Sequence, residues 1–491
     1  MFGVKSVGII VETLRYIYLI YRLFHLSLKD SDYNLKCVRN ILFKTNATGI
    51  KLLQFLVTRK ELYTDKCREH FDDVYENCKT HEWKYTMEMY QEDFGKDIEN
   101  EFHIEVLNDA DSSTHIIGSG SIGQVYKLFN KKHNTFMAVK VKHPNIDDSV
   151  HNIVNVIRIL HRIVNSITNV PFTTLLSDFI GNVSLQIDYV KERYNLEKFA
   201  DLYASESHII IPKVYYSSRR IIVMSYHDGL KLSQVTNKAI KVSASIDLMY
   251  FIYSSLLVND FVHCDLHHGN WKVQISDAPT DTPTDASNDT PNDAYKLVIY
   301  DCGIVAKSGD LSSNRKIMES CFDSNFMRIM SLVVEDDTEG TKIGAILTQY
   351  VKDVCNESIY KGSERFTLIT TKVLQLGLRI NQNYIRMLQA FIICDKTIAS
   401  NVDMMTRLLG GNNSCYGLKI GVTIGCYLGI LKGMNKYAEL QEYFEKWLDD
   451  VPEYKLDLLD WLDEEFGHRD VDVFYDVIYS IIMQSHKHIS E

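Results

Sequence analysis

Residues 261–270 read FVHCDLHHGN, and this short stretch decides between the fold classes open to the chain. It follows an apolar segment with helical spacing and combines an acid, an amide and three histidines. Histidines four apart on a helix can share a zinc ion, which makes His263, His267 and His268 a candidate metal site. Gly269 and the strand-like residues after it favour a loop instead, in which His263 fixes the backbone through a hydrogen bond.

The other two polar residues of this stretch, Asp265 and Asn270, have the spacing of a kinase catalytic loop. In such a loop the Asp orients the acceptor hydroxyl, and an Asn five residues later holds magnesium. A second metal-holding Asp should follow a short hairpin, and Asp301 in VIYDCG supplies it. Gly303 is expected to permit the backbone turn that directs this carboxylate into the site. The three polar residues therefore predict a phosphoryl-transfer site that holds Mg²⁺ through Asn270 and Asp301.

The hairpin expected between these motifs carries an insert, SDAPTDTPTDASNDTPNDA, at about residues 276–294. A four-residue repeat places its aspartates in register, and it holds three of the seven prolines of the chain. Such a composition cannot bury enough apolar surface to offset its ordering entropy, so we expect a disordered hairpin tip. Calcium binding is the alternative interpretation of the regular aspartates, but a calcium loop needs a glycine turn and a closing glutamate.

Upstream, the segment GSGSIGQV contains Gly118, Gly120 and Gly123 in a GxGxxG array. Dinucleotide-binding turns and kinase nucleotide flaps both use such arrays, because glycines let backbone N–H groups approach phosphates closely. The dinucleotide motif must open a helix and precede an acidic residue about 20 positions on. Here the glycines run into strand-like residues, and Lys140 follows within MAVKV, which is the order of a kinase flap. The turn-like residues 131–134 predict a hairpin between the two strands.

A lysine in the third strand of a small sheet can reach the α- and β-phosphates of ATP, and a carboxylate must hold it there. Glu192 in DYVKERYNLEKF is the candidate, with Asp188 and Asn195 on neighbouring turns of the same helix face. A solvated helix charge is the alternative for Glu192 considered alone. In chain order the flap, the lysine, the glutamate and the Asp-Asn-Asp set follow the whole kinase superfamily. We therefore expect an α+β, bilobal protein-kinase-like fold with a small β-sheet N-lobe, a helical C-lobe and a helical N-terminal extension.

Two absences narrow the class of kinase. The loop reads His-Cys-Asp, without the arginine that commonly precedes the catalytic aspartate of protein kinases, and no Ala-Pro-Glu follows DCG. Without the usual activation segment, the platform that docks a peptide substrate is missing. The sequence therefore favours a small molecule or a lipid as the acceptor, or ATP hydrolysis.

Composition argues against a general nucleic-acid binder, because a formal net charge of −11 opposes phosphate neutralisation. The ten cysteines form no CxxC pair, which indicates an intracellular, reducing compartment. Residues 1–28 are apolar and aromatic but broken by charges, so no membrane span is expected. An amphipathic helix packed on the rest of the protein is the simpler interpretation, and a helix lying on a membrane surface is the alternative.

Together these motifs resemble the aarF-domain, or UbiB-type (ADCK-like), family of atypical protein kinases, over about residues 40–400. SIGQV, AVKVKHPNI, DYVKERYN, FVHCDLHHGN and YDCG are similar to successive motifs of that family. GIKLLQFLVTRKELY, residues 49–63, is similar to its signature extension, in which a Lys-x-Gly-Gln segment folds over the nucleotide pocket. The resemblance gives Lys51 and Gln54 that role, and it implies an association with isoprenoid-quinone biosynthesis and lipid homeostasis.

The chain departs from this family pattern at three places. Residues 118–120 are Gly-Ser-Gly where the family has an alanine-rich flap, and Leu53 replaces the glycine of the extension. Gln186 stands where the Glu-x-Asp motif of the family begins, and its neutral amide removes a charge partner for Lys51. We expect an extension held less tightly and a more mobile flap than in the family, which favours phosphoryl transfer to protein.

The expected organisation has four parts. They are a helical extension with the KxxQ segment at 1–103, a kinase-like N-lobe with inserted helices at 104–229, a kinase-like C-lobe at 230–420 and a helical region at 421–491. Residues 208–229 within the N-lobe are expected to form two strands. The cofactors are ATP and Mg²⁺, and the catalytic residues are Asp265, as proton acceptor, and Lys140. The residues expected to bind ATP are Ile117, Gly118, Ser119, Gly120, Ser121, Ile122, Gly123, Gln124, Val125, Lys140 and Glu192.

Two other functions stay open. Choline- and aminoglycoside-type kinases also carry a loop like HCDLHHGN, but they do not share the SIGQV flap or the KLLQ extension. A nonenzymatic, nucleotide-sensing scaffold or membrane adaptor is the second alternative, because occupancy of every catalytic position does not demonstrate turnover.

Overall fold

The chain divides into two compact units in the computed structural model. Unit 1 comprises Met1–Asn195, Lys213–Tyr226 and Thr338–Arg379, and unit 2 comprises Leu196–Pro212, His227–Asp337 and Ile380–Glu491. The structure describes residues 2–29, 31–42, 45, 47–57, 64–71, 80–104, 115–165, 171–275, 295–314, 326–336, 341–356 and part of 368–387. The predictions for the insert at about 276–294 and for the helical region at 421–491 lie outside these residues.

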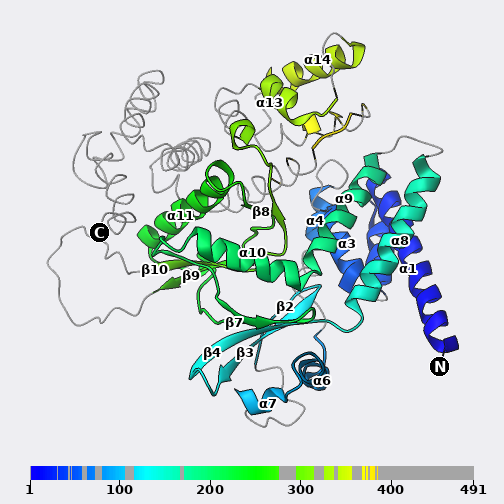
Figure 1. Cartoon of the computed structure of the whole chain (residues 1–491). Coiled ribbons are helices and arrows are strands. Elements are labelled where there is room, and N and C mark those ends of the chain that lie inside the picture. The colour runs from blue at the N-terminus through cyan, green and yellow to red at the C-terminus, as the bar shows by residue number, and fades with distance from the viewer. Residues whose placement is uncertain are drawn as a thin grey trace, which may run out of the picture. The chain divides into compact units, whose positions relative to one another are not determined.

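Helices make up the first part of unit 1. They are α1 (Phe2–Leu28), α2 (Asp32–Leu42), α3 (Ala47–Val57), α4 (Asp65–His70), α6 (Trp83–Phe94) and α7 (Ile98–Glu101). α1 contacts α2, α3 and α8 (Ile146–Asn165), and α3 also contacts α9 (Pro171–Gln186). Figure 1 shows α1, α3, α8 and α9 side by side. Within the described part of the chain, no helix is both long and apolar enough to cross a membrane.

The central element of unit 1 is an antiparallel sheet with the order β1-β3-β4-β7-β6, in which β2 pairs with β3. Its strands are β1 (Phe102–His103), β2 (Ile116–Ser119), β3 (Gly123–Asn130), β4 (Thr135–Lys142), β6 (Val214–Ser217) and β7 (Ile221–Ser225). β3 and β4 pair from Gly123 opposite Lys142 to Asn130 opposite Thr135, so the predicted hairpin around 131–134 is confirmed.

The two faces of this sheet differ in character because successive side chains of a strand point to opposite sides. One face forms an apolar core with α6 and α7, which lie on one side of the sheet in Figure 1. Val139 and Val141 of β4 belong to this core, so Lys140 between them points to the opposite face. The other buried members of the core are Met89, Tyr90, Ile98, Phe102, Tyr126, Leu128, Met137, Ile221 and Val223.

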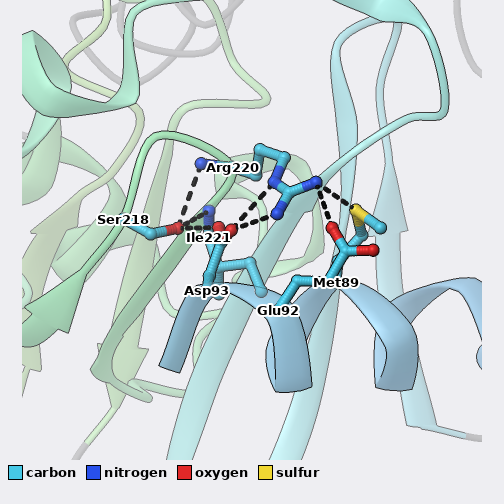
Figure 2. Close-up of polar contacts among 6 residues, drawn as sticks. All are labelled: Met89, Glu92, Asp93, Ser218, Arg220 and Ile221. Carbon is cyan, nitrogen blue, oxygen red and sulfur yellow. Dashed lines mark hydrogen bonds and ion pairs between the residues drawn. The ribbon is translucent and has the colours of Figure 1, made fainter. Parts of the chain in front are cut away.

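A cluster of polar contacts ties the end of α6 to the turn between β6 and β7 (Figure 2). The Arg220 guanidinium donates to Asp93 through Nε and Nη2, and its Nη1 donates to Glu92 at 2.9 Å and to the Met89 sulfur at 2.8 Å. The Ser218 hydroxyl donates to Asp93 Oδ2 at 2.5 Å. The same hydroxyl accepts from the backbone N–H groups of Arg220 and Ile221. This cluster anchors α6 on the sheet.

Unit 2 contains two small sheets, two complete α-helices and the second half of α10 (Tyr189–Leu202) among its described residues. β5 (Ile209–Ile210) pairs in parallel with β10 (Tyr295–Ile299), β10 pairs antiparallel with β9 (Trp271–Ile275), and β8 (Val262–His263) pairs with β11 (Val305–Ala306). The other elements are the 3₁₀ turn Leu232–Gln234, α11 (Lys238–Leu257) and α13 (Phe326–Val333), while α14 (Lys342–Asn356) belongs to unit 1.

The prediction of two strands within residues 208–229 is wrong in number. β6 and β7 are two strands that pair with each other, but Ile209–Ile210 forms a third strand, β5, which belongs to the sheet of unit 2. Pro212 explains the separation, since proline has no backbone N–H to donate to a strand ladder. The apolar residues 209–211 gave no indication in the sequence that the chain passes from one sheet to another here.

Candidate functional site

The glycine turn connects β2 to β3, and its glycines differ in what surrounds them. A side-chain carbon at Gly123 would lie 2.3 Å from the Val141 carbonyl oxygen and 2.6 Å from Tyr189 OH, so only glycine fits there. The space at Gly118 is open, and the nearest atom to a carbon at Gly120 is 3.8 Å away. Gly123 therefore allows close strand packing, while the space beside Gly118 and Gly120 is open. The Gly120 N–H donates to the Gly123 carbonyl at 3.0 Å, which closes the turn.

Lys140 and Glu192 form a buried ion pair in unit 1. Lys140 Nζ donates to Glu192 Oε1 at 2.6 Å, and the glutamate side chain is 0% exposed. The Tyr189 ring centre lies 5.1 Å from Lys140 Nζ, a cation–π distance. Lys140 pairs with Val125 of β3, which places the ion pair beside the glycine turn. The structure thus brings together the flap, the lysine and the glutamate that the sequence singled out.

Helix α10 (Tyr189–Leu202) carries Glu192 in its first turn, where a negative charge is favoured by the helix dipole. The face predicted around Glu192 is partly wrong. Asn195 is buried as Glu192 is, but Asp188 is exposed and precedes the helix. Its Oδ1 accepts the Lys191 backbone N–H at 3.1 Å, which is an N-cap contact. Asp188 therefore fixes where the helix begins instead of sharing the buried face.

The FVHCDLHHGN stretch forms a loop after β8 in unit 2, and His263 is locked within it. His263 Nδ1 accepts the Asp265 N–H at 3.2 Å, and the other ring nitrogen, Nε2, lies 3.2 Å from the Tyr300 carbonyl oxygen. A carbonyl can only accept, so Nε2 carries the proton. Both ring nitrogens are occupied by the backbone, which excludes His263 as a zinc ligand and agrees with the expected loop-fixing hydrogen bond.

Asn270 closes the same loop. Its Nδ2 donates to the Asp265 carbonyl at 2.8 Å, and its backbone N–H donates to the His267 carbonyl at 2.8 Å. Tyr300 N–H donates to the Asn270 carbonyl at 2.8 Å, which joins the loop to the residue ahead of Asp301. Because Nδ2 is used in the loop, the amide leaves Oδ1 as its acceptor. An amide oxygen with the Asp301 carboxylate is a donor set that suits Mg²⁺.

Asp301 has a left-handed backbone, with φ 49°, a conformation that non-glycine residues rarely adopt. The predicted turn is present at residues 302–303, but its left-handed residue is Asp301 instead of Gly303, and such strain is typical of functional positions. Burial lowers the pKa of His263, and the Tyr300 carbonyl and the Asp265 and Asp301 carboxylates partly oppose that shift. His263 also contacts the backbone of Asp265 and that of Tyr300, the residue before Asp301, which places Asp265 and Asp301 in one neighbourhood of unit 2.

Several predicted site residues stay untested. Lys51 is half-buried in α3, and the Gln54 side chain lies outside the described part of the structure. Phe55 of α3 contacts Phe179 of α9 with ring centres 5.6 Å apart, so the extension helix is attached to α9, the helix that ends at Gln186. The prediction that Lys51 and Gln54 cover the nucleotide pocket remains a prediction. It also remains a prediction that the ion pair of unit 1 and the Asp-Asn-Asp set of unit 2 form one active site.

Gln124 lies differently from what its assignment to the ATP site suggests. Its side chain is 0% exposed and bonds to the backbone of His81 and to Tyr126. Any contact with a nucleotide would have to come from its backbone. Sequence reasoning also missed Tyr189, whose ring lies beside Lys140, and the 2.9 Å contact between His81 and His143, because no spacing rule connects residues that meet only through the fold.

A family model described as the ABC1 atypical kinase-like domain matches residues 36–333, more than half of the chain. Protein ACTIVITY OF BC1 COMPLEX KINASE 3, chloroplastic, of Arabidopsis thaliana is 26% identical over 242 residues, which are 48% of this chain and 33% of that protein. Probable serine/threonine-protein kinase abkC of Dictyostelium discoideum is 29% identical over 240 residues, 46% of this chain and 33% of that protein. AarF domain-containing protein kinase 1 of Gallus gallus is 29% identical over 193 residues, 37% of this chain and 35% of that protein.

The matched region spans about a third of the length of these relatives. The expected α+β protein-kinase-like fold is confirmed by the family match together with the antiparallel sheet and helices described above. The resemblance to the aarF-domain kinases is confirmed as well. This chain belongs to the ABC1 atypical kinase-like family.

Proposed function

We propose that this chain binds ATP with Mg²⁺ and transfers the γ-phosphoryl group to a hydroxyl acceptor or to water. The observation that carries the proposal is the buried pair between Lys140 and Glu192 beside the glycine turn. A buried charge pair costs desolvation, so it needs a reason beyond stability, and holding a lysine for phosphates is such a reason. Family membership and the kinase names of the relatives give further support.

In the proposed reaction the residues act mainly by positioning and charge. The flap and Lys140 hold the phosphates, and Glu192 orients Lys140. Asn270 and Asp301 hold Mg²⁺, which neutralises charge on the phosphates when bound. The acceptor oxygen forms a bond to the γ-phosphorus as the bond to the β-phosphate oxygen breaks, which releases ADP. Asp265 takes the proton of the acceptor.

The proposal is tested by measuring nucleotide binding and turnover on the full chain. We expect ATP to raise the thermal midpoint more with Mg²⁺ than without it, and Asp265→Asn to retain this shift while losing turnover. Asp301→Asn should lose the Mg²⁺-dependent part of the shift. Asp228→Asn, at an exposed position of the same unit, is the control and should behave as wild type. ATP binding without turnover in the wild-type chain would favour the nucleotide-sensing scaffold instead.

For the acceptor we propose a lipid-related or small molecule, ahead of the protein acceptor that a more mobile flap would favour. The support is the His-Cys-Asp loop without a preceding arginine and the absence of an Ala-Pro-Glu sequence after DCG. Radiolabelled ATP offered in parallel with polar lipids, small alcohols and proteins would identify the acceptor class. Label that enters only protein would contradict the proposal, and label released only as phosphate would identify an ATPase.

We also propose that α1 contacts a membrane surface. The support is an exposed apolar stripe with helical spacing, in which Ile10 is 58%, Leu14 60% and Tyr21 52% exposed. Ile17 and Tyr18 are exposed in the same stripe, and tyrosines suit the membrane–water interface. Leu14→Glu should lower flotation with anionic vesicles, while Glu88→Gln in α6 should not. Equal flotation of the Leu14→Glu variant and the wild type would contradict this contact.

A further inference from the structure

A chain of hydrogen bonds in unit 1 runs from the segment ahead of α6 to the glycine turn. His81 Nδ1 lies 2.9 Å from His143 Nδ1, and His143 Nε2 lies 2.9 Å from the Gly120 carbonyl oxygen. On the other side of the first ring, His81 Nε2 lies 2.9 Å from Thr86 Oγ1. Thr86 Oγ1 in turn lies 2.8 Å from Tyr126 OH. Five residues from three segments of the chain therefore share one path of hydrogen bonds to the flap.

Gln124 completes the far end of this path. Its Oε1 accepts the His81 backbone N–H at 2.9 Å, and its Nε2 donates to the His81 carbonyl at 3.1 Å and to Tyr126 OH. The amide thus holds the His81 backbone by both of its polar atoms. The segment ahead of α6 is fixed directly to β3, the strand that leaves the glycine turn.

The chemistry of the two ends dictates where the protons lie. The Gly120 carbonyl can only accept, so His143 carries its proton on Nε2 and accepts from His81 on Nδ1. His81 then accepts from Thr86 on Nε2. The Gln124 amide nitrogen can only donate, so Tyr126 accepts from it and donates to Thr86. With both imidazoles neutral, every donor in the chain meets an acceptor.

A proton added to either imidazole breaks this pattern. If His143 gained a proton on Nδ1, two donors would face each other across the 2.9 Å contact with His81. If His81 gained one on Nε2, it could no longer accept from Thr86. Burial lowers the pKa of both rings, which keeps them neutral. The network therefore has one stable arrangement of protons.

His143 holds the glycine turn by two carbonyl groups. Its ring donates to the Gly120 carbonyl, and its backbone N–H donates to the Ile122 carbonyl at 2.9 Å. A turn that binds phosphate must present N–H groups to the anion and keep its carbonyl oxygens elsewhere. Both carbonyls are already bound by His143, so the conformation of the turn depends on the His143 ring at Gly120 and on the His143 backbone at Ile122.

The support for His81 is the anchored helix α6. Its carboxyl end is held by Arg220 through Asp93 and Glu92 (Figure 2), and Trp83 at its start contacts the Tyr126 ring with centres 5.0 Å apart. Thr86, which donates to His81, lies in this same helix. The position of the imidazole chain is thus set by a helix fixed at both ends.

We propose that His81 and His143 are positioning residues that set the conformation of the nucleotide flap, with α6 as the support for His81. This inference rests on the proposed function, because it assumes that the flap contacts the phosphates of ATP. Neither histidine touches the nucleotide in this scheme. They act through the backbone of residues 120–122.

The test compares the KM for MgATP with kcat in the full chain. His81→Phe keeps a ring but removes both nitrogens, and we expect KM to rise about five- to tenfold, the effect of losing roughly one hydrogen bond, with little change in kcat. His81→Asn keeps a donor toward His143 and should restore part of the affinity. Tyr85→Phe is the control. The Tyr85 ring makes a T-shaped contact with the His81 ring, but its hydroxyl lies outside the chain of hydrogen bonds.

Each outcome decides between explanations. A wild-type KM in a folded His81→Phe variant would overturn the inference, as would an equal loss in His81→Asn, which would indicate a role in packing alone. If His81→Phe does not fold, Thr86→Val and Tyr126→Phe carry the test, because each removes one hydroxyl at nearly constant volume. A wild-type KM in both of these would also overturn the inference. A wild-type chain that neither binds nor hydrolyses MgATP would overturn the proposed function itself.

Discussion

Lys140–Glu192 and Arg220–Asp93 join the same kinds of charge in unit 1, but in opposite settings. The Glu192 side chain is 0% exposed and that of Lys140 is 11% exposed, whereas Arg220 is 31% exposed and also bonds to Glu92. Taking two charges out of water costs more than a partly solvated pair does. The buried pair is therefore weak evidence for stability and stronger evidence for function, while the Arg220 pair serves to anchor α6.

The largest difference between the two pairs should appear in turnover. Lys140→Met should lower Mg²⁺-dependent ADP release by about 100- to 1,000-fold, because a fixed positive charge on the phosphates is lost. Lys142→Met is a matched control on the same strand, since Lys142 is also buried and pairs with Asp147 at 2.9 Å. Equal losses in the two variants would show that the strand, not the Lys140 charge, is required.

The next effect concerns stability. Glu192→Gln leaves Lys140 buried beside a neutral amide, so the free energy of unfolding should fall by about 3 kcal/mol. Glu92→Gln removes an exposed partner of Arg220 and should change it by less than about 1 kcal/mol. Urea unfolding of the full chain measures both values. Similar losses at the two positions would remove the distinction between the pairs.

A smaller effect is expected from the anchor of α6. Arg220→Lys keeps the charge but cannot form the fork to Asp93, so the free energy of unfolding should fall by about 1 kcal/mol. Because α6 supports His81, the same variant should raise the KM for MgATP slightly. A loss of stability with an unchanged KM would show that the Arg220 contacts stabilise α6 without affecting the conformation of the flap.

The effect that is smallest at neutral pH is a pH dependence on the α6 face of the sheet. Burial, with His143 close by, lowers the pKa of His81 from 6.5 to about 3. Between these values the unfolded chain binds a proton that the folded chain does not, so stability should fall as the pH drops through this window. Burial lowers the pKa of His143 as well, so it adds to the same trend. His81→Asn should show a shallower slope than wild type, and an equal or steeper slope would contradict the assignment.

Local patterns predicted the strands and chemical groups that depend on short spacing. The glycine array, Lys140 and the loop with Asp265 and Asn270 are read from neighbouring residues, and the hairpin of β3 and β4 follows from alternation and a turn. The pairing of Lys140 with Glu192 came from the order of motifs, because the two are distant in sequence.

The features that could not be predicted from the sequence depend on contacts between distant segments. Nothing in the spacing connects His81 to His143, or Arg220 to Asp93. Asp93-Phe94-Gly95 has the same sequence as the metal-binding Asp-Phe-Gly motif of protein kinases. It nevertheless lies at the end of α6, where the Asp93 carboxylate binds Arg220. Asp188 was misplaced for the related reason that helix spacing does not reveal which residue begins the helix.

The crowding at Gly123 has a consequence for how genetic variants of this chain should be ranked. A motif search treats the glycines of the turn as equivalent, but only at Gly123 would an added methyl group collide with the Val141 carbonyl and Tyr189 OH. A change to alanine there would push two strands apart and reduce the amount of folded protein, whereas the same change at Gly118 meets open space. Loss of abundance and loss of nucleotide chemistry are therefore separable outcomes within a single short motif.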